Sequence, residues 1–316
     1  MTPPSTRSPG ARGVTEPRLT QEAHVRERTL SALLIIPVVV LAIAAGGVGI
    51  GILVLGLAAL AAREAERLLP PAGRPVIRNG VVGGALVLVA AAAVPAILGS
   101  KLLGDQQAAL DLAARVSSID GVALVGVVAV ALAMIAFARR DPADGFAAWS
   151  STAFGALYVS LLGAVAILTT QWTDPASVEG AFWPERRWIL VLLAGVWSFD
   201  TGAYLVGRAV GRRPFLPWIS PKKTLEGVLG GLVVATVVVA LVLWISGSSP
   251  LEALILGPLL GVVAQSGDLA ESLLKRAAGV KDSGTLLPGH GGILDRVDSI
   301  LFAAPVLAAW VALVHG

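Results

Sequence analysis

Long apolar runs dominate the chain, and short polar segments separate them. Nine runs can be drawn, each close to the ~20 residues that cross a hydrocarbon core. They cover residues 29–45, 47–62, 80–99, 121–138, 151–170, 188–207, 225–246, 251–268 and 296–314. The runs are continuous rather than alternating, which favours helices over a β-barrel. The pattern predicts an all-α, polytopic integral membrane protein with about nine transmembrane helices.

The polar segments add detail to this outline. Residues 1–27 lack periodicity and are predicted to form a disordered tail, not a signal peptide. Residues 105–118 have the pattern of a short amphipathic helix lying on a surface. Glycines near residue 46 leave open whether the first two runs are separated by a turn or form one bent helix. We expect a tail over 1–27, N-terminal transmembrane helices over 28–187 and a C-terminal catalytic part over 188–316.

The cations indicate an orientation. If the N-terminus is cytoplasmic, only four of the 24 Lys and Arg residues fall in outside segments, namely Lys101, Arg115, Arg186 and Arg187. Cytoplasmic loops of membrane proteins carry an excess of Lys and Arg. The chain is therefore predicted to have a cytoplasmic N-terminus and, with an odd number of spans, a C-terminus outside.

Composition supports the membrane class. The chain of 316 residues is 55% hydrophobic and only 14% charged, against about 25% charged in a typical soluble domain. It contains no cysteine, which excludes disulfides and thiolate metal sites. The net charge of +3 says little about partners, and no nucleic-acid partner is expected.

One polar cluster interrupts the run over 188–207. Asp200, Tyr204 and Arg208 follow the spacing i, i+4, i+8, so they share one helix face. A carboxylate within a span is costly and normally faces a wet or protein-lined cavity. The cluster is therefore interpreted as the wall of a site, and the alternative is a structural tether between Asp200 and Arg208.

A second cluster, Ser220-Pro221-Lys222-Lys223-Thr224, precedes the run over 225–246. Ser220 or Thr224 can cap the following helix, whose positive N-terminal end would then lie beside two lysines. This combination attracts phosphate. The alternative is an ordinary capped helix start with lysines at the membrane interface.

A third cluster follows the run over 251–268. Asp268, Ser272 and Lys275 lie on one side of a helix that is predicted to continue beyond the span, although a solvated charged face is the alternative. Farther along, glycines let backbone N–H groups approach a ligand closely. Carboxylates supply hard oxygen ligands, and together with lysines they suggest Mg²⁺ bound to phosphate. The carboxylates of this last segment are Asp282, Asp295 and Asp298.

A longer signature joins these residues. It comprises Ser272, Lys275-Arg276, Lys281-Asp282, Pro288-Gly289-His290-Gly291-Gly292 and Asp295-Arg296-Val297-Asp298. The signature resembles that of the phosphatidate cytidylyltransferase family, the CDP-diacylglycerol synthases. Upstream, residues 200–204 and 220–227 also resemble family blocks, so that the similarity covers about residues 198–299.

The resemblance implies the reaction CTP + phosphatidic acid → CDP-diacylglycerol + pyrophosphate. It implies Mg²⁺ or another divalent cation, and Asp268 and Asp282 are then the expected metal-binding carboxylates. It also implies a cell (inner) membrane protein embedded in the lipid bilayer, with the active site facing the cytoplasm. A homodimer is expected on the resemblance alone.

These expectations assign roles to individual residues. The expected catalytic residues are Asp200, Lys222, Lys223, Lys275, Lys281, His290, Asp295 and Arg296. The expected substrate-binding residues are Ser220, Thr224, Ser272, Arg276, Gly289, Gly291 and Gly292. We expect the lysines to hold two phosphate groups and the 289–292 loop to present backbone N–H groups to a phosphate or to cytidine.

Three other interpretations stay open. A secondary transporter would spread polar residues through several spans, whereas the runs over 29–45, 80–99 and 121–138 are almost wholly apolar. A CDP-alcohol phosphotransferase would carry a different aspartate pattern, which is not found here. A third alternative keeps the chemistry and changes the lipid acceptor, for example to a prenyl-ether analogue.

Overall fold

The computed structural model describes residues 35–99, 107–170, 186–286 and 291–315. Every regular element in these ranges is a helix. In chain order the elements are a short helix Ile35–Ala44, α2 (Gly46–Leu68), α3 (Gly80–Leu98), α4 (Gln107–Ser117), α5 (Gly121–Ala136), α6 (Pro142–Ser160), α7 (Gly163–Thr170), α8 (Arg187–Val210), α9 (Leu225–Ile245), the 3₁₀-helix η2 (Pro250–Glu252), α10 (Ala253–Ala277) and α11 (Leu294–Val314).

Seven segments of the described chain are long and apolar enough to cross a membrane. Two of the seven join consecutive helices, α6 with α7 and η2 with α10. One further pair of helices is bent by 74° and comprises Asp111–Ser117 and Gly121–Ala136. If this pair forms one span, the described residues contain up to eight candidate spans. The all-α polytopic fold is thus confirmed. The count of nine stays a prediction, because the first expected span is described only over Ile35–Ala44.

Some helix boundaries differ from the apolar runs for local reasons. The run expected to begin at residue 151 begins at Pro142, because Asp141 accepts a hydrogen bond from the Ala143 N–H and caps the helix. The helix expected to continue beyond residue 268 does so and ends at Ala277. Near residue 46 the chain makes a turn: helix Ile35–Ala44 ends, and α2 starts at Gly46, which has a positive φ of 64°.

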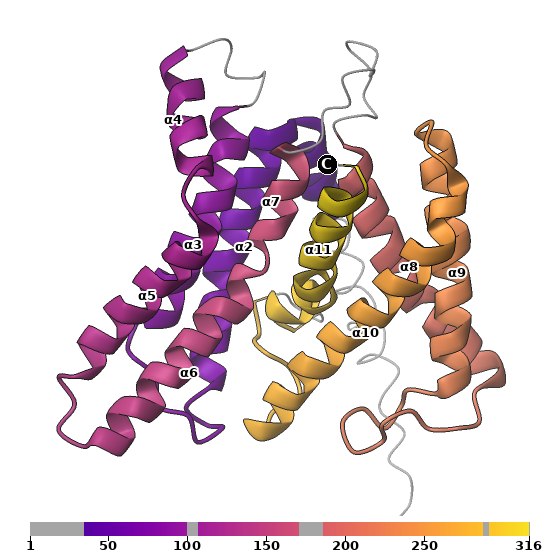
Figure 1. The fold of residues 1–316 in the computed structure, drawn as a ribbon. Helices are drawn as coiled ribbons and strands as arrows, with labels where there is room; N and C mark the ends of the chain where they lie inside the picture. The colour runs from indigo at the N-terminus through magenta and orange to yellow at the C-terminus, as the bar shows by residue number, and fades with distance from the viewer. Residues whose placement is uncertain (1–34, 100–106, 171–185, 287–290, 316) are drawn as a thin grey trace, which may run out of the picture.

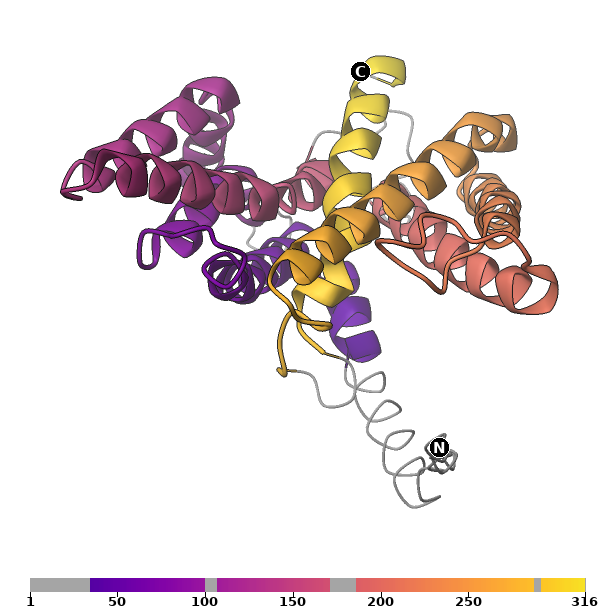
Figure 2. The same ribbon diagram turned by 90° about the horizontal axis from the view of Figure 1, so that it is seen from below.

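The helices form two groups with α10 and α11 between them. Figure 1 shows α2, α3, α5 and α6 on one side and α8 and α9 on the other, and the view from below agrees (Figure 2). Helix α11 contacts α2, α7, α8 and α10, so it connects the two groups. Large side chains in its surroundings, such as Trp188, Phe199 and Leu260, are almost completely buried.

Helices α8 and α9 approach each other closely. A side chain on Gly227 would come within 2.7 Å of the Ala203 carbonyl oxygen and 3.1 Å of the Gly207 Cα atom. Small residues at such crossings allow the dense packing that holds membrane helices together. The close crossing brings the polar face of α8 next to the start of α9.

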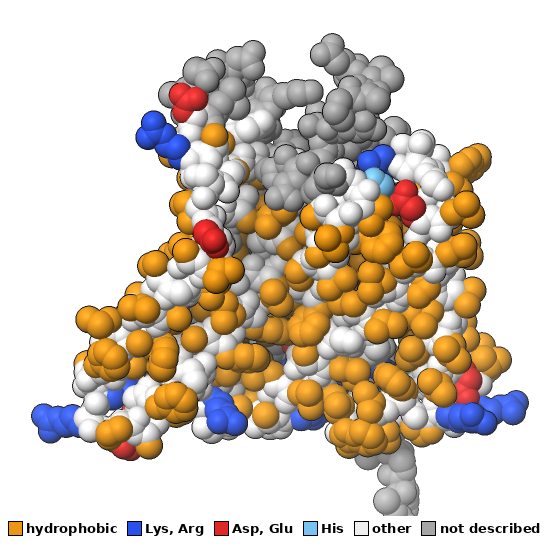
Figure 3. Space-filling model, in the orientation of Figure 1, with side chains coloured by type: hydrophobic (Ala, Val, Ile, Leu, Met, Phe, Trp, Pro, Cys, Tyr) orange, Lys and Arg blue, Asp and Glu red, His pale blue; other side chains and the backbone are white. Residues whose placement is uncertain are grey.

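Cations gather at one end of the helices. Figure 3 shows Lys and Arg side chains along the lower edge of the molecule, below a wide band of hydrophobic side chains. Two of the loops predicted to lie inside meet at this edge, where Arg139 donates a hydrogen bond to the Val76 carbonyl at 2.8 Å. Arg115, predicted to lie outside, belongs to α4 at the opposite end, and Arg187, also predicted to lie outside, is the first residue of α8, whose last turns reach the basic end. Which end faces the cytoplasm stays a prediction.

Candidate functional site

A cavity of about 620 Å³ lies between α8, α9, α10, α11 and the loops at the basic end. Most of the residues that line it are polar or charged, unlike the apolar residues of the surrounding surface. The charged side chains in the lining are Asp200, Arg208, Lys222, Lys223, Asp268, Lys275, Asp282, Asp295, Arg296 and Asp298. Charged groups so concentrated among membrane helices indicate a functional site.

Helix α8 supplies one wall of the cavity. Asp200, Tyr204 and Arg208 all line it, which confirms that they share a face. The Arg208 guanidinium donates a hydrogen bond to the Tyr204 hydroxyl at 3.2 Å. The described residues contain no Asp200–Arg208 ion pair, which argues against the tether, and the role of this face as the wall of a functional site stays a prediction.

The loop over residues 211–224 brings two lysines to the cavity. Its base is held by Glu226, whose carboxylate accepts hydrogen bonds from the N–H groups of Arg212 and Arg213 at 3.0 and 3.1 Å. Thr224 caps α9 by accepting a hydrogen bond from the Gly227 N–H, as predicted. Lys222 and Lys223 precede this cap, and the lining includes both of them together with Ser220 and Thr224.

Asp268 links α10 to this loop. Its carboxylate forms an ion pair with the Lys223 ammonium and accepts a hydrogen bond from the Ser272 hydroxyl at 3.4 Å. Ser272 is therefore a neighbour of a lining residue, although it does not itself line the cavity. The pair places a carboxylate of α10 and a cation of the loop before α9 beside each other in the cavity wall.

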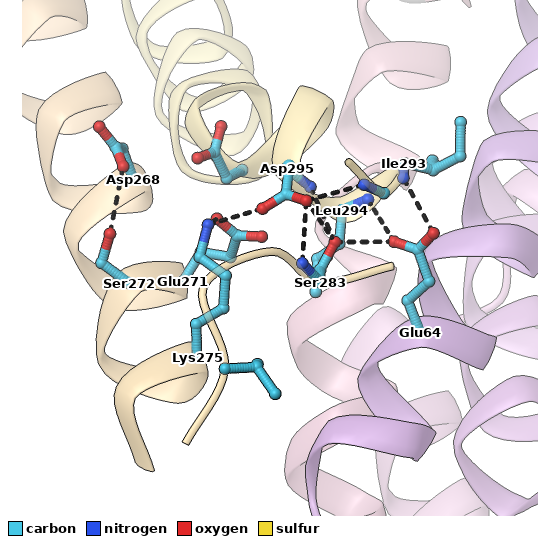
Figure 4. A network of polar contacts seen from close by, with 12 residues as sticks. Glu64, Asp268, Glu271, Ser272, Lys275, Ser283, Ile293, Leu294 and Asp295 are labelled. Atoms are coloured by element: carbon cyan, nitrogen blue, oxygen red, sulfur yellow. Dashed lines mark hydrogen bonds and ion pairs between the residues drawn. The ribbon is translucent and has the colours of Figure 1, made fainter. Parts of the chain in front are cut away.

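Lys275 is the centre of a second charged group (Figure 4). Its ammonium donates to the Glu271 carboxylate at 2.5 Å and to the Asp295 carboxylate at 2.6 Å. Asp295 also accepts hydrogen bonds from the Ser283 N–H, the Ser283 hydroxyl and the Gly292 N–H, at 2.9, 2.9 and 2.8 Å. These contacts fix the position of Lys275 before any substrate arrives.

The loop over residues 278–293, which we call the signature loop, joins α10 to α11 and is described except for 287–290. Gly291 has a positive φ of 79°, as expected for a tight glycine turn. The Gly292 N–H is directed to Asp295, so this amide is not presented to a ligand, and the expectation of a substrate-binding amide at Gly292 is corrected on that point. Gly289 and His290 lie outside the described residues.

Two further signature cations lie away from the cavity. Arg276 is exposed, and its guanidinium donates to the Val280 carbonyl at 3.3 Å. Lys281 is also exposed. Neither belongs to the described lining, and Gly291 is absent from it too. Their predicted roles stay predictions.

The sequence interpretation assigned no role to Glu64, Glu271 or Gln265, and all three side chains are buried. Glu64 and Glu271 are 6% and 0% exposed, and Gln265 is 5% exposed. Glu64 has a signal in the sequence, because it lies on the helical stripe of the buried residues Ala61 and Leu68. A carboxylate on a buried stripe requires a partner, which here lies in the signature loop.

The carboxylates of the cavity fit a hard divalent cation. Asp200, Asp268 and Asp282 offer only oxygen atoms, which Mg²⁺ prefers. Within the described residues no group of three or more His, Cys, Asp or Glu side chains is arranged to hold a metal alone.

Comparison with known proteins supports the resemblance seen in the sequence. The model of the cytidylyltransferase family matches residues 26–314. A phosphatidate cytidylyltransferase of Bacillus subtilis is 50% identical over 121 residues, which cover 37% of this chain and 45% of the relative. The proteins of the same name from Staphylococcus haemolyticus and Synechocystis are 46% identical over 123 residues and 44% over 152 residues. Those matches cover 38% and 42% of this chain and 47% and 49% of the relatives.

The matched segment thus spans about half the length of these curated relatives. The family model, in contrast, extends over nearly the whole chain and includes both helix groups. The polar cavity, the signature loop and the apolar helices all fall within the matched residues. The chain belongs to the cytidylyltransferase family.

Proposed function

We propose that this protein transfers the CMP moiety of CTP to phosphatidic acid, giving CDP-diacylglycerol and pyrophosphate. The observation that carries the proposal is the charged cavity at the basic end of an otherwise apolar helix assembly. A soluble, highly anionic nucleotide and a membrane-bound phosphate can meet there. The relatives' name and the family membership point to the same reaction.

The chemistry requires little from a general base. The lipid phosphate is already an anionic nucleophile: one of its oxygens forms a bond to the α-phosphorus of CTP. The bond between that phosphorus and the oxygen bridging to the β-phosphate breaks, and pyrophosphate leaves with the electron pair. Catalysis of such a transfer rests on positioning and on charge stabilisation.

The cations of the cavity supply both positioning and charge stabilisation. Lys222 and Arg208 are exposed enough to receive phosphate oxygens, and both line the cavity. Lys275 is already fixed by Glu271 and Asp295, so little reorganisation is needed when charge develops in front of it. We assign these three groups to the separation and neutralisation of the two phosphate moieties, which otherwise repel each other.

Mg²⁺ or another divalent cation is part of the proposal. Asp268 and Asp282 would hold it, and once bound it would neutralise charge on the triphosphate. Asp268 is paired with Lys223, so this ammonium is the group that exchanges its carboxylate partner for a phosphate. Lys223 would thereby remain beside the substrate.

The proposed location is the cell (inner) membrane, with the cavity and the N-terminus facing the cytoplasm and the C-terminus outside. The basic edge supports this orientation through the positive-inside rule. In the proposed orientation the cavity would open to the side where CTP is available. A homodimer is not needed for any step.

Product analysis with the purified full-length chain tests the proposal. Protein in detergent is incubated with radiolabelled CTP, Mg²⁺ and phosphatidic acid, and the lipids are then separated. Label is expected in CDP-diacylglycerol, with pyrophosphate released in equal amount. No sealed compartment is present, so a transporter would give no labelled lipid, and that result would overturn the proposal. Replacing phosphatidic acid by a phosphorylated prenyl ether tests the alternative acceptor.

A further inference from the structure

Glu64 lies in α2, outside the charged cavity, yet its carboxylate points at the signature loop (Figure 4). It is 6% exposed and accepts three hydrogen bonds. The donors are the Ser283 hydroxyl at 2.9 Å, the Ile293 N–H at 3.0 Å and the Leu294 N–H at 2.8 Å. All three donors come from residues more than two hundred positions farther along the chain. A buried carboxylate of α2 therefore binds the signature loop and the start of α11, which lie between the two helix groups.

Two of these bonds replace a missing helix cap. The first N–H groups of a helix have no partner within the helix. Ile293, at the N-cap position of α11, has no side chain that could accept a hydrogen bond. Glu64 supplies the acceptor from α2, and its negative charge also complements the positive end of the helix. The start of α11, which carries Asp295, is thus fixed by a different helix.

The third bond connects Glu64 to the charged cavity. The Ser283 oxygen lies 2.9 Å from a Glu64 carboxylate oxygen and 2.9 Å from an Asp295 carboxylate oxygen. A hydroxyl has one proton to donate, so the Ser283 hydroxyl bonds one of the two carboxylates at a time and lies in contact with both. Asp295 in turn holds Lys275 at 2.6 Å. A continuous path runs from Glu64 through Ser283 and Asp295 to the Lys275 ammonium.

The glycines of the loop leave room for this carboxylate. A side chain at Gly284 would place its Cβ atom 2.7 Å from a Glu64 oxygen. A Cβ atom at Gly292 would overlap both Glu64 and the Ser283 hydroxyl. The loop backbone therefore closes directly around the Glu64 carboxylate.

We propose that Glu64 is a positioning residue for the transfer reaction, acting through Ser283 and Asp295 on Lys275. Its side chain does not line the cavity, so we assign it no direct contact with substrate. The inference rests on the proposed function, because Lys275 matters for turnover only if the cavity binds phosphates. Through Glu64, a helix of the N-terminal part would thus fix the position of the Lys275 ammonium.

The chain offers a matched control two residues away. Glu66 is also in α2, and it accepts a hydrogen bond from a loop backbone group, the Asn79 N–H, at 2.7 Å. Its partner belongs to the α2–α3 turn and not to the site. Glu66→Gln therefore changes the charge of the same helix end and weakens a similar bond without touching the path to Lys275.

Turnover of Glu64→Gln, Ser283→Ala, the double variant and Glu66→Gln is compared with the unaltered chain, with CTP varied at fixed phosphatidic acid. We expect kcat of Glu64→Gln to fall about 10- to 100-fold, the usual loss when an orienting partner is removed. Glu66→Gln should stay near the unaltered value. Ser283→Ala keeps both bonds to α11, so it tests the path even if Glu64→Gln fails to fold.

The double variant separates positioning from capping. If Glu64 acts through Ser283, the double variant should lose no more kcat than the poorer single variant. Losses that multiply, or a Glu66→Gln loss equal to that of Glu64→Gln, would overturn the proposal. Hydrogen exchange of the Ile293 and Leu294 amides is measured without substrate. We expect faster exchange in Glu64→Gln than in the unaltered chain. Unchanged exchange would contradict the contact between Glu64 and these amides. An unaltered chain that makes no labelled lipid contradicts the proposed function instead.

Discussion

The N-terminal helices α2–α7 and the C-terminal helices α8–α11 bury polar side chains for different purposes. In the described N-terminal part, Ser151 and Thr152 bond backbone groups of their own bundle. In the C-terminal part, the buried polar residues Glu271, Asp298 and Ser299 lie around or line the charged cavity. Because polar groups among membrane helices are costly, this difference separates a scaffold from a site. Glu64 is the N-terminal residue that crosses the division.

The largest effect is expected at the proposed metal-binding carboxylates. Asp268→Asn and Asp282→Asn each remove a charge from the cavity wall while keeping the side-chain shape, so folding should be retained. We expect turnover to fall by at least about 10²- to 10³-fold, as for loss of one preorganised electrostatic group. The measurement is labelled-lipid formation by protein whose folding is checked by gel filtration and circular dichroism. Near-normal turnover by either folded variant would show that its carboxylate was wrongly assigned.

Lys275→Met should damage both activity and stability. Its ammonium lies between Glu271 and Asp295, whose side chains are 0% and 8% exposed. Removing one partner of a buried ion pair typically costs about 3–5 kcal/mol, because the remaining charge is left unpaired. The melting temperature in detergent should fall clearly, together with turnover.

Lys222→Met is the matched control for Lys275→Met. Lys222 is exposed at the cavity, and no described residue forms an ion pair with it. We expect lower turnover at an unchanged melting temperature. An equal stability loss in the two variants would contradict the distinction between a fixed lysine and one available to substrate.

The sequence predicts the spans and the polar face of α8, but it does not predict the contact between α2 and the signature loop. Apolar runs locate the spans because a helix must satisfy its backbone groups within the membrane. The i, i+4, i+8 spacing places Asp200, Tyr204 and Arg208 together because helix geometry is fixed. No such rule relates α2 to the signature loop. The contact between Glu64 and Leu294 depends on how distant helices pack, so only the three-dimensional arrangement reveals it.

In the N-terminal helices, Thr152→Val should lower stability without changing the reaction. The Thr152 hydroxyl accepts the Ile77 N–H at 2.8 Å and is fully buried. Valine keeps the shape but leaves that N–H unpaired, at a cost of about 1–3 kcal/mol. The melting temperature should drop, while kcat and KM for CTP stay the same for the folded fraction. Thr152→Ser keeps the hydroxyl and should recover most of the stability; a changed KM in Thr152→Val would mean that the scaffold and the site are not separable at this position.

The smallest effect is expected at the end opposite the basic edge. Arg115 lies in α4, and Lys101 is the other cation predicted to lie outside near it in the chain. Arg115 is exposed and is not part of the cavity lining, and a cation exposed to solvent contributes little to stability. Lys101 lies outside the described residues, so its expectation rests on the sequence alone. Arg115→Ala and Lys101→Ala should therefore leave turnover and melting temperature within error of the unaltered chain. Arg208→Ala removes the same charge from the cavity wall and should lower turnover. Comparing turnover of Arg208→Ala with that of Arg115→Ala therefore separates the effect of the position of a charge from the effect of net charge. If Arg115→Ala were as damaging as Arg208→Ala, the overall positive charge would explain the activity, and the division of the chain into scaffold and site would lose its electrostatic basis.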